Sequence, residues 1–212
     1  MSLTEILKAH ADQSALKYPE AVKLIMRDAI DQLSASELTH KALKTGDTFP
    51  EFTLSNAKGI EVSSSSLLEQ GPLIVAFYRG GWCPYCNIEL RALQDALPEF
   101  KSRGAQLVAI SPESPDNSLS TTEKNNLDFE VLTDTNNALA KSLNLAYQLP
   151  EDLVALYANR FKIDLNKSQQ NDNNELPISA TYVIDTSGKI RYHFIEEDYK
   201  LRADPKAILN AL

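Results

Sequence analysis

The sequence predicts an α/β protein, a sandwich of helices around a mixed sheet, with a helical extension at its N-terminus. Three observations lead to this prediction. Residues 73–78 and 106–110 are continuous apolar runs, which suit strands covered on both faces. Strands of this kind alternate with helical patterns through the middle of the chain. Residues 181–184 and 190–194 flank a turn and predict an antiparallel hairpin, which makes the sheet mixed.

Residues 1–44 are predicted to form the extension, and residues 45–212 the main domain. Within the extension, residues 3 to about 43 are expected to be helical. Pro19 stands near the start of its second helix, where the missing N–H of proline costs nothing. Apolar residues follow the spacing of one helix face: Val22, Ile25, Met26, Ala29, Ile30 and Leu33. This stripe predicts packing either on the main domain or on a second copy of the chain. The second alternative is a homodimer.

The main domain is expected to open with a hairpin. Residues 49–54 contain a short strand, placed at a sheet edge by Pro50, and residues 60–62 pair back with it. Serines 63–66 offer a cap for a short helix. The apolar run 73–78 is then the central strand, and a helix begins at Pro84. One face of that helix is apolar and carries Cys86, Leu90, Leu93, Leu97 and Phe100.

The second half of the domain continues the alternation. After the strand at 106–110 we expect a polar loop over 111–120, a strand at 129–132 and a short helix at 137–143. Residues 167–175 are rich in Asn and Gln and predict a mobile surface insertion. Residues 205–212 are expected to close the chain as a helix.

The composition excludes several classes of function. The 212 residues have a formal net charge of −8, with 43% apolar and 24% charged residues, as in ordinary globular proteins. A nucleic-acid partner would require a basic face, which the sequence lacks. No apolar run is long enough to span a membrane. The N-terminus lacks the features of a signal peptide, which predicts a cytoplasmic protein.

Cys83 and Cys86 are the only cysteines of the chain. A disulfide across so short a loop would add little stability, because closing a short loop costs little entropy. In a cytoplasmic chain this spacing indicates redox chemistry, and packing of two inert cysteines is the alternative. The histidines at positions 10, 40 and 193 have no ligand spacing to the cysteines, so we expect no metal. Nothing in the sequence requires a flavin or a nucleotide cofactor.

Each part of the segment around the cysteines has a physical role. Gly80 and Gly81 allow a tight loop between the strand and the helix, and close approach of a substrate. Free N–H groups at the start of the helix favour the thiolate over the thiol, and a thiolate attacks peroxides or disulfides. Arg79 either adds positive charge beside the cysteines or forms a solvated contact or a salt bridge elsewhere. Cys83 and Cys86 lie one helical turn apart, so they can form a disulfide with little rearrangement.

From about Gly46 to the C-terminus, the sequence resembles the peroxiredoxin-like family that contains alkyl hydroperoxide reductase and thiol-specific antioxidant. The resemblance rests on four segments: Phe49 to Leu54, Phe77 to Cys86, Ile110 to Glu113, and Thr181 to Asp185 with Gly188. It implies a thioredoxin-like α/β/α sandwich, reduction of peroxides by a cysteine thiolate, and regeneration by a thioredoxin-like donor.

The resemblance leaves open which cysteine attacks the peroxide. Peroxiredoxins carry Pro, three residues, Thr, two residues and then the peroxidatic Cys. An ungapped overlay places Arg79 at that Pro, Cys83 at that Thr and Cys86 at the peroxidatic Cys. The thioredoxin pattern instead makes Cys83 the attacking thiol. The family's usual Arg before the Thr181 strand is replaced by Ser179, and either Arg79 or Arg202 is a candidate to supply its charge.

Three hypotheses about function follow. The first is a thiol-dependent peroxidase that acts on hydrogen peroxide or small organic hydroperoxides through the dithiol pair. The second is a thiol-disulfide oxidoreductase or redox relay without significant peroxidase activity, favoured by the sequence Trp-Cys-Pro-Tyr-Cys. The third is a redox-sensing protein that binds a partner through its N-terminal helices.

Overall fold

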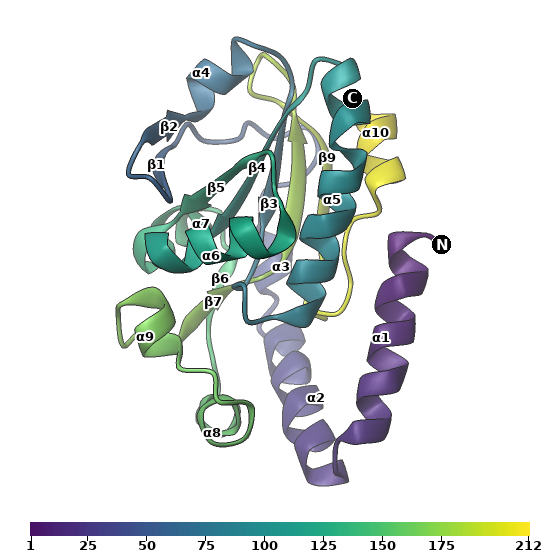
Figure 1. Cartoon of the computed structure of the whole chain (residues 1–212), viewed down its shortest axis with the longest axis vertical. Coiled ribbons are helices and arrows are strands. Elements are labelled where there is room, and N and C mark those ends of the chain that lie inside the picture. The colour runs from purple at the N-terminus through teal and green to yellow at the C-terminus, as the bar shows by residue number, and fades with distance from the viewer.

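The computed structural model describes all residues, 1–212, and confirms the predicted α/β sandwich around a mixed sheet (Figure 1). The sheet has seven strands in the order β2-β1-β5-β4-β3-β8-β9. Their bounds are Thr53–Asn56 (β1), Glu61–Ser63 (β2), Leu73–Phe77 (β3), Gln106–Ser111 (β4), Glu130–Thr133 (β5), Ala180–Ile184 (β8) and Ile190–Ile195 (β9). A separate two-stranded sheet pairs Ala146–Gln148 (β6) with Glu175–Pro177 (β7).

Strand β3 lies at the centre because every one of its side chains is apolar and buried. It runs parallel to β4 and antiparallel to β8, which makes the sheet mixed. Alternate side chains enter different cores. Leu73, Val75 and Phe77 join the larger apolar cluster. Ile74 and Ala76 join the cluster beneath the helices Pro84–Ser102 (α5) and Pro205–Ala211 (α10).

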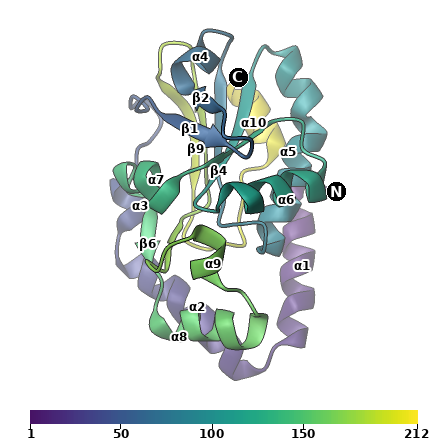
Figure 2. The ribbon, with the colours of Figure 1, turned by 60° about the vertical axis from the view of Figure 1, so that its left-hand side comes forward.

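Helices cover both faces of the sheet, as Figures 1 and 2 show from two sides. The predicted apolar face of α5 is confirmed, since Leu90, Leu93, Leu97 and Phe100 are all buried. The remaining helices of the main domain are Ser64–Leu68 (α4), Pro115–Asn125 (α6), Ala138–Ser142 (α7), Glu151–Leu156 (α8) and Leu165–Gln169 (α9). A 3₁₀ turn at Thr135–Asn137 precedes α7, and a π-helical turn at Tyr157–Phe161 follows α8.

The helical extension is confirmed as Leu3–Lys17 (α1), Glu20–Ala35 (α2) and Leu38–Lys41 (α3). Ser2 and Glu5 form a capping box at the start of α1. Helices α1 and α2 form a V in both views, with α1 beside α5 and α2 beside α8 (Figures 1 and 2). Leu3 and Leu7 are buried in the same cluster as both cysteines. The extension therefore packs on its own main domain, at the cysteine end.

The predicted polar loop at 111–120 is wrong, because most of it belongs to α6. Ser114 stands at the N-cap position and Pro115 at the first helical position, which favours a helix start. The buried face of α6 carries Ser118, Thr121 and Asn125. Since these side chains are polar, the helix has no apolar stripe by which its periodicity could be recognised.

The predicted surface insertion at 167–175 begins within a helix and ends at a strand. Residues 165–169 form α9, and Glu175 begins β7. Gln169 is buried and its amide donates a hydrogen bond to the carbonyl of Glu175. Ser168 bonds a carboxylate beside the cysteine loop. The polar composition of this segment reflects side chains that pair with one another rather than with solvent alone.

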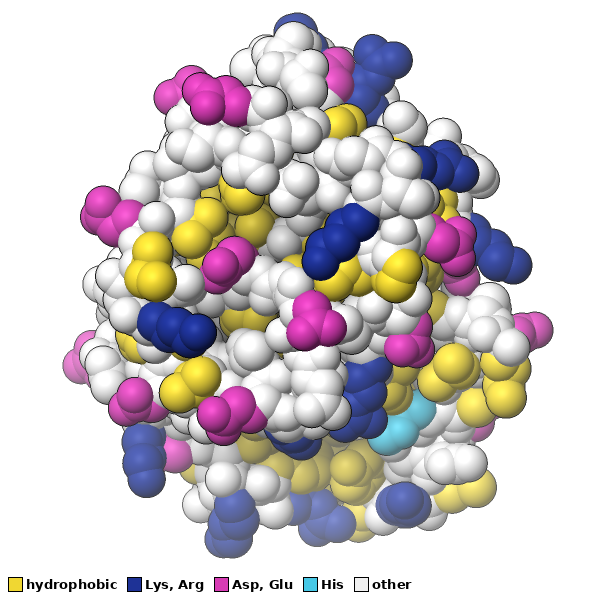
Figure 3. Space-filling view, turned by 45° about the horizontal axis from the view of Figure 1, so that its top comes forward, with side chains coloured by type: hydrophobic (Ala, Val, Ile, Leu, Met, Phe, Trp, Pro, Cys, Tyr) yellow, Lys and Arg dark blue, Asp and Glu magenta, His cyan; other side chains and the backbone are white.

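Charged side chains of both signs are scattered over the face drawn in Figure 3, with apolar side chains between them. No helix is long and apolar enough to cross a membrane.

Candidate active site

Cys83 lies where the central strand β3 passes through a short loop into α5. It is the N-cap residue of α5, and Pro84 is the first residue of the helix, as predicted. The loop has no space for larger residues at its two glycines. A Cβ on Gly80 would lie 2.4 Å from Nε1 of Trp82, and one on Gly81 would lie 2.1 Å from Oγ1 of Thr121. The two glycines therefore allow the loop to pack tightly around the cysteine.

The two cysteines are free thiols in this structure and are both buried, with exposed fractions of 1% for Cys83 and 0% for Cys86. Burial alone would raise the pKa of Cys83, but the hydrogen bond from Cys86 and the charges of Arg79 and Arg202 lower it. Burial raises the pKa of Cys86, and the neighbouring Cys83 sulfur raises it further. The site thus favours a thiolate at Cys83 and a thiol at Cys86.

Arg79 is buried with 2% exposure and has no carboxylate partner. Its guanidinium donates a hydrogen bond to the hydroxyl of Tyr157. Its central carbon lies 4.6 Å from the ring centre of Tyr199, 5.3 Å from that of Trp82 and 5.8 Å from that of Tyr157. Aromatic faces attract a cation without neutralising it. Arg79 is therefore neither solvated nor salt-bridged, and its charge acts on the cysteines.

Arg202 is the second buried cation of the site. Its Nη2 lies 3.2 Å from the Sγ atom of Cys86, and its Nε donates to the Glu89 carboxylate. Burial raises the pKa of Glu89 to about 7, against the opposing charge of Arg202. The charges of Arg79 and Arg202 thus both act on the dithiol, and Arg202 also contacts Cys86 directly. Ser179, by contrast, is buried beside β8, and its hydroxyl has no hydrogen-bond partner.

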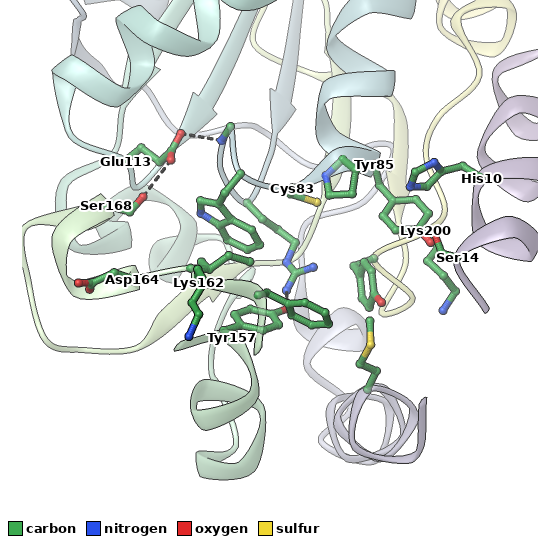
Figure 4. A pocket seen from close by; sticks show the side chains of 18 of the residues that line it. His10, Ser14, Cys83, Tyr85, Glu113, Tyr157, Lys162, Asp164, Ser168 and Lys200 are labelled. Atoms are coloured by element: carbon green, nitrogen blue, oxygen red, sulfur yellow. Dashed lines mark hydrogen bonds between the residues drawn. The ribbon is translucent and has the colours of Figure 1, made fainter. Parts of the chain in front are cut away.

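A hydrogen-bond network fixes the loop before Cys83. The backbone N–H of Gly81 donates to Oε2 of Glu113 at 2.7 Å, and the hydroxyl of Ser168 donates to Oε1 of Glu113 at 2.9 Å (Figure 4). The amide of Asn87 donates to the carbonyls of Gly81 and Cys83. Burial raises the pKa of Glu113. These bonds join the loop to the connection between β4 and α6 and to α9, which lie far away in the sequence.

Cys83 and Arg79 line a cleft of about 1440 Å³, whereas Cys86 does not line it. Figure 4 shows Cys83 between two groups of side chains, with Glu113, Ser168 and Asp164 on one side and His10 and Ser14 on the other. The cleft is bounded by α1 and α2, by the start of α5, and by segments of α6, α9 and the π-helical turn. The cleft therefore gives access to Cys83 from this side.

Sequence reasoning missed several residues of the site. Glu89 had a local signal, because a charged residue three positions after Cys86 lies next to the buried face of α5. Glu113 belongs to a segment that supported the family resemblance, but its sequence does not reveal its contact with Gly81. No sequence pattern pointed to Tyr157, because it lies in a π-helical turn that the sequence does not predict. His10 lies edge-on to Tyr85 at the cleft.

Comparisons with known proteins agree with this arrangement. A family model described as the AhpC/TSA family matches residues 45–193. The chain is similar to the chloroplastic peroxiredoxin Q of Sedum lineare, at 30% identity over 69% of this chain and 66% of that protein. It is similar to the chloroplastic peroxiredoxin Q of Populus jackii, at 28% identity over 69% of this chain and 57% of that protein. The alignments thus span less than two thirds of these relatives.

Solved structures of similar shape come from the same group. The crystal structure of the peroxidoxin BcpB from Mycobacterium tuberculosis has a TM-score of 0.62 at 23% identity, covering 80% of this chain and 96% of that chain. The reduced 2-Cys peroxiredoxin of Plasmodium vivax has a TM-score of 0.58 at 18% identity, covering 79% of this chain and 93% of that chain. These likenesses confirm the predicted thioredoxin-like sandwich.

Proposed function

Because this chain belongs to the AhpC/TSA family, whose model matches residues 45–193, we propose that it is a thiol-dependent peroxidase. The observation that carries the proposal is the contrast between the two sulfurs. Cys83 lines the cleft and its pKa is lowered, whereas Cys86 lies behind it and its pKa is raised. A dithiol peroxidase needs an activated thiolate that faces the peroxide and a neighbouring thiol that reacts in the second step, and this arrangement meets both needs.

In the oxidative half of the cycle, the Cys83 thiolate attacks the terminal oxygen of the peroxide. A sulfur–oxygen bond forms and the oxygen–oxygen bond breaks, and the leaving alkoxide or hydroxide takes a proton to give an alcohol or water. Cys83 becomes a sulfenic acid. The Cys86 thiol then attacks the Cys83 sulfur, a disulfide forms and water leaves with the proton of Cys86.

Each arginine has a separate role in this scheme. Arg79 faces the cleft beside Cys83, where its charge stabilises the thiolate and the negative charge that develops on the leaving oxygen. Arg202 bonds the Cys86 sulfur and is suited to stabilise it as its proton departs in the second step. We propose that Arg79 and Arg202 together replace the family's usual arginine. Glu89 orients Arg202 and neutralises part of its charge.

A thioredoxin-like dithiol then regenerates the enzyme. One donor thiolate attacks the Cys83–Cys86 disulfide to give a mixed disulfide, and the second donor thiol releases the reduced enzyme. The reducing conditions that keep such a donor active are those of the cytoplasm, where we propose that the reaction occurs.

The proposal is tested by peroxide-dependent oxidation of NADPH in the presence of thioredoxin and thioredoxin reductase. We expect Cys83→Ser to abolish turnover and sulfenic acid formation. We expect Cys86→Ser to form one sulfenic acid per chain, trapped by dimedone, and then to stop. The reverse pattern would assign the attack to Cys86, as the family overlay does. Absence of peroxide reduction in the unmodified protein would refute the peroxidase.

A thiol-disulfide oxidoreductase is the second candidate. It is favoured by the position of Cys83 at the N-cap of α5, because a low-pKa cysteine there also attacks disulfides. Reduction of insulin disulfides, without peroxide-dependent NADPH loss, would support this function instead.

A further inference from the structure

A single carboxylate connects the Cys83 loop to a segment that lies far away in the sequence. Glu113 stands in the connection between β4 and α6 and is 3% exposed. Its Oε2 accepts a hydrogen bond from the backbone N–H of Gly81 at 2.7 Å, and its Oε1 accepts one from the hydroxyl of Ser168 at 2.9 Å (Figure 4). We propose that Glu113 is a positioning residue, which holds Cys83 in the geometry in which its sulfur attacks the peroxide. This inference rests on the proposed function and adds a residue to it.

Gly81 is held at both its N–H and its carbonyl. The N–H donates to Glu113, and the carbonyl accepts a hydrogen bond from the amide of Asn87 at 2.8 Å. The same amide donates to the carbonyl of Cys83 at 2.9 Å. Thr121 packs directly against Gly81, since a Cβ there would lie 2.1 Å from Oγ1 of Thr121. Gly81 is therefore a fixed point of the loop, two residues before the reactive sulfur.

The position of this loop determines how Cys83 meets the start of α5. Cys83 is the N-cap residue of the helix. Burial would raise the pKa of Cys83, and the backbone N–H of Cys86 is among the groups that lower it. The N–H groups of the first helical turn have no partner within the helix, and their effect on a charge falls off within that turn. A displaced loop would therefore weaken the contact between the thiolate and the helix N-terminus.

Ser168 is itself fixed beside Glu113. Its carbonyl accepts hydrogen bonds from the backbone N–H of Ser114 at 2.9 Å and from the amide of Asn117 at 3.0 Å. The hydroxyl of Ser168 thus reaches Glu113 from an anchored helix and orients the carboxylate toward Gly81. Ser168→Ala removes this orientation but leaves the bond from Gly81. Its effect on Cys83 should have the same direction as that of Glu113→Ala and be smaller.

The two hydrogen bonds explain a carboxylate at this position better than its charge does. Each carboxylate oxygen accepts from one donor, whereas a negative charge near a thiolate disfavours that thiolate. Burial raises the pKa of Glu113, and the bonds from Gly81 and Ser168 oppose this effect. A glutamine side chain can keep both contacts, because its oxygen can accept from Gly81 and its amide can donate to the Ser168 hydroxyl oxygen. We therefore expect Glu113→Gln to retain the function that Glu113→Ala loses.

Asp134 offers a matched control elsewhere in the fold. It is also a buried carboxylate, with 1% exposure, and its oxygens accept hydrogen bonds from the backbone N–H groups of Leu139 and Ala140, both at 2.9 Å. It does not line the cleft. Asp134→Ala removes comparable bonds away from the Cys83 loop. It should lower the free energy of unfolding and leave the reactivity of the thiol unchanged.

The thiol can be measured directly in proteins that carry Cys86→Ser, where Cys83 is the only cysteine. We expect Glu113→Ala to raise the midpoint of thiolate formation, with a change on the order of tenfold in the thiolate equilibrium. Ultraviolet absorbance and the pH profile of alkylation by iodoacetamide measure this midpoint. Glu113→Gln and Asp134→Ala should keep the original midpoint. An unchanged midpoint in Glu113→Ala would overturn the proposal, and so would equal effects of Glu113→Gln and Glu113→Ala.

Peroxide turnover distinguishes failure of this proposal from failure of the proposed function. In proteins with both cysteines, kcat/KM for hydrogen peroxide should fall on the order of tenfold in Glu113→Ala and stay constant in Glu113→Gln and Asp134→Ala. Absence of peroxide reduction by the unmodified protein would refute the peroxidase, whereas the thiolate midpoints would still establish or overturn the role of Glu113. If Glu113→Ala does not fold, Ser168→Ala takes its place, and an unchanged midpoint in that variant would overturn the proposal.

Discussion

Cys83 and Cys86 differ in environment although one helical turn separates them. Cys83 stands at the N-terminus of α5, where free N–H groups and the helix dipole favour negative charge. Cys86 lies inside the first turn and is fully buried. The motif predicts both residues as reactive, but only the structure separates them, since their difference arises from Arg79, Arg202 and the shape of the cleft.

The lowered pKa of Cys83 predicts how the reaction depends on pH. The thiolate is populated above the folded pKa, so the rate of peroxide attack should be near its maximum at neutral pH and fall on acidification. The thiolate also stabilises the fold, and this contribution is lost as the pH falls through the folded pKa. Ultraviolet absorbance of the thiolate in Cys86→Ser would measure the midpoint. A midpoint at or above that of an ordinary cysteine would contradict the assignment.

Tyr157 acts on the chemistry through Arg79. Its hydroxyl accepts a hydrogen bond from the guanidinium, and its ring contacts the same cation. In Tyr157→Phe the ring remains but the hydroxyl is lost, so Arg79 is less well positioned. We expect the pKa of Cys83 to rise and kcat/KM for hydrogen peroxide to fall on the order of tenfold.

The control for this variant is Tyr192→Phe, because Tyr192 packs against the apolar cluster beneath α5 and α10 and does not line the cleft. It should leave the thiolate midpoint unchanged. If Tyr157→Phe lowered stability but left the thiolate midpoint unchanged, Tyr157 would have a purely structural role.

Glu89 and Arg202 form a buried ion pair, with side-chain exposures of 2% and 1%. Breaking such a pair by removing one partner costs about 3–5 kcal/mol, because the remaining charge stays buried. Glu89→Gln should therefore lower the free energy of unfolding by an amount of this order, measured by urea denaturation. Glu99→Gln, on the exposed side of the same helix, should change it by less than about 0.5 kcal/mol. Equal effects of the two substitutions would show that the pair does not stabilise the fold.

At the scale of elements, α1 is held to α5 by few side chains. Leu3 and Leu7 are buried in the cluster that contains both cysteines, whereas Ile6 is 39% exposed. Leu7→Ala should loosen α1 and increase the rate at which a bulky disulfide reagent reacts with the thiols. Ile6→Ala removes a comparable apolar side chain from the other face and should leave that rate unchanged. Similar rates for both variants would mean that α1 does not shield the cysteines.

Elements with an apolar pattern were predictable from the sequence. Strand β3, helix α5 and the β8–β9 hairpin bury their apolar side chains at the expected positions. Helix α6 was not predictable, because its buried side chains are polar. The segment 144–177 was not predictable either, because its short elements bury their apolar side chains against one another and against Ala29 of the distant helix α2, and polar contacts between distant residues add to this packing. The amide of Asn125 donates to Asn87, and the hydroxyl of Ser168 donates to Glu113. Such pairs have no signature in a single sequence.

At the scale of the whole molecule, the candidate site combines local and distant parts. Arg79, Cys83 and Cys86 lie within one short segment, so residue chemistry and spacing suffice to predict them. Arg202 could be proposed as a site residue because Ser179 replaces the family's usual arginine. Its contact with Cys86, however, is visible only in the folded structure. The cleft could not be predicted, because its walls come from α1, α2 and the turn between them, from α6 and α9, and from the π-helical turn. Tertiary structure alone brings these segments together.

The burial of both sulfurs predicts that the two halves of the proposed catalytic cycle are separated kinetically. A peroxide can diffuse along the cleft to Cys83, but a protein donor carries its thiol on a large rigid surface that cannot enter there. We therefore predict that reduction by such a donor begins with a first-order opening step, in which α1 and α2 move away from α5 and α8. The rate of reduction should rise with donor concentration only until this opening becomes limiting. The plateau would then report the opening rate of the N-terminal helices rather than the strength of donor binding.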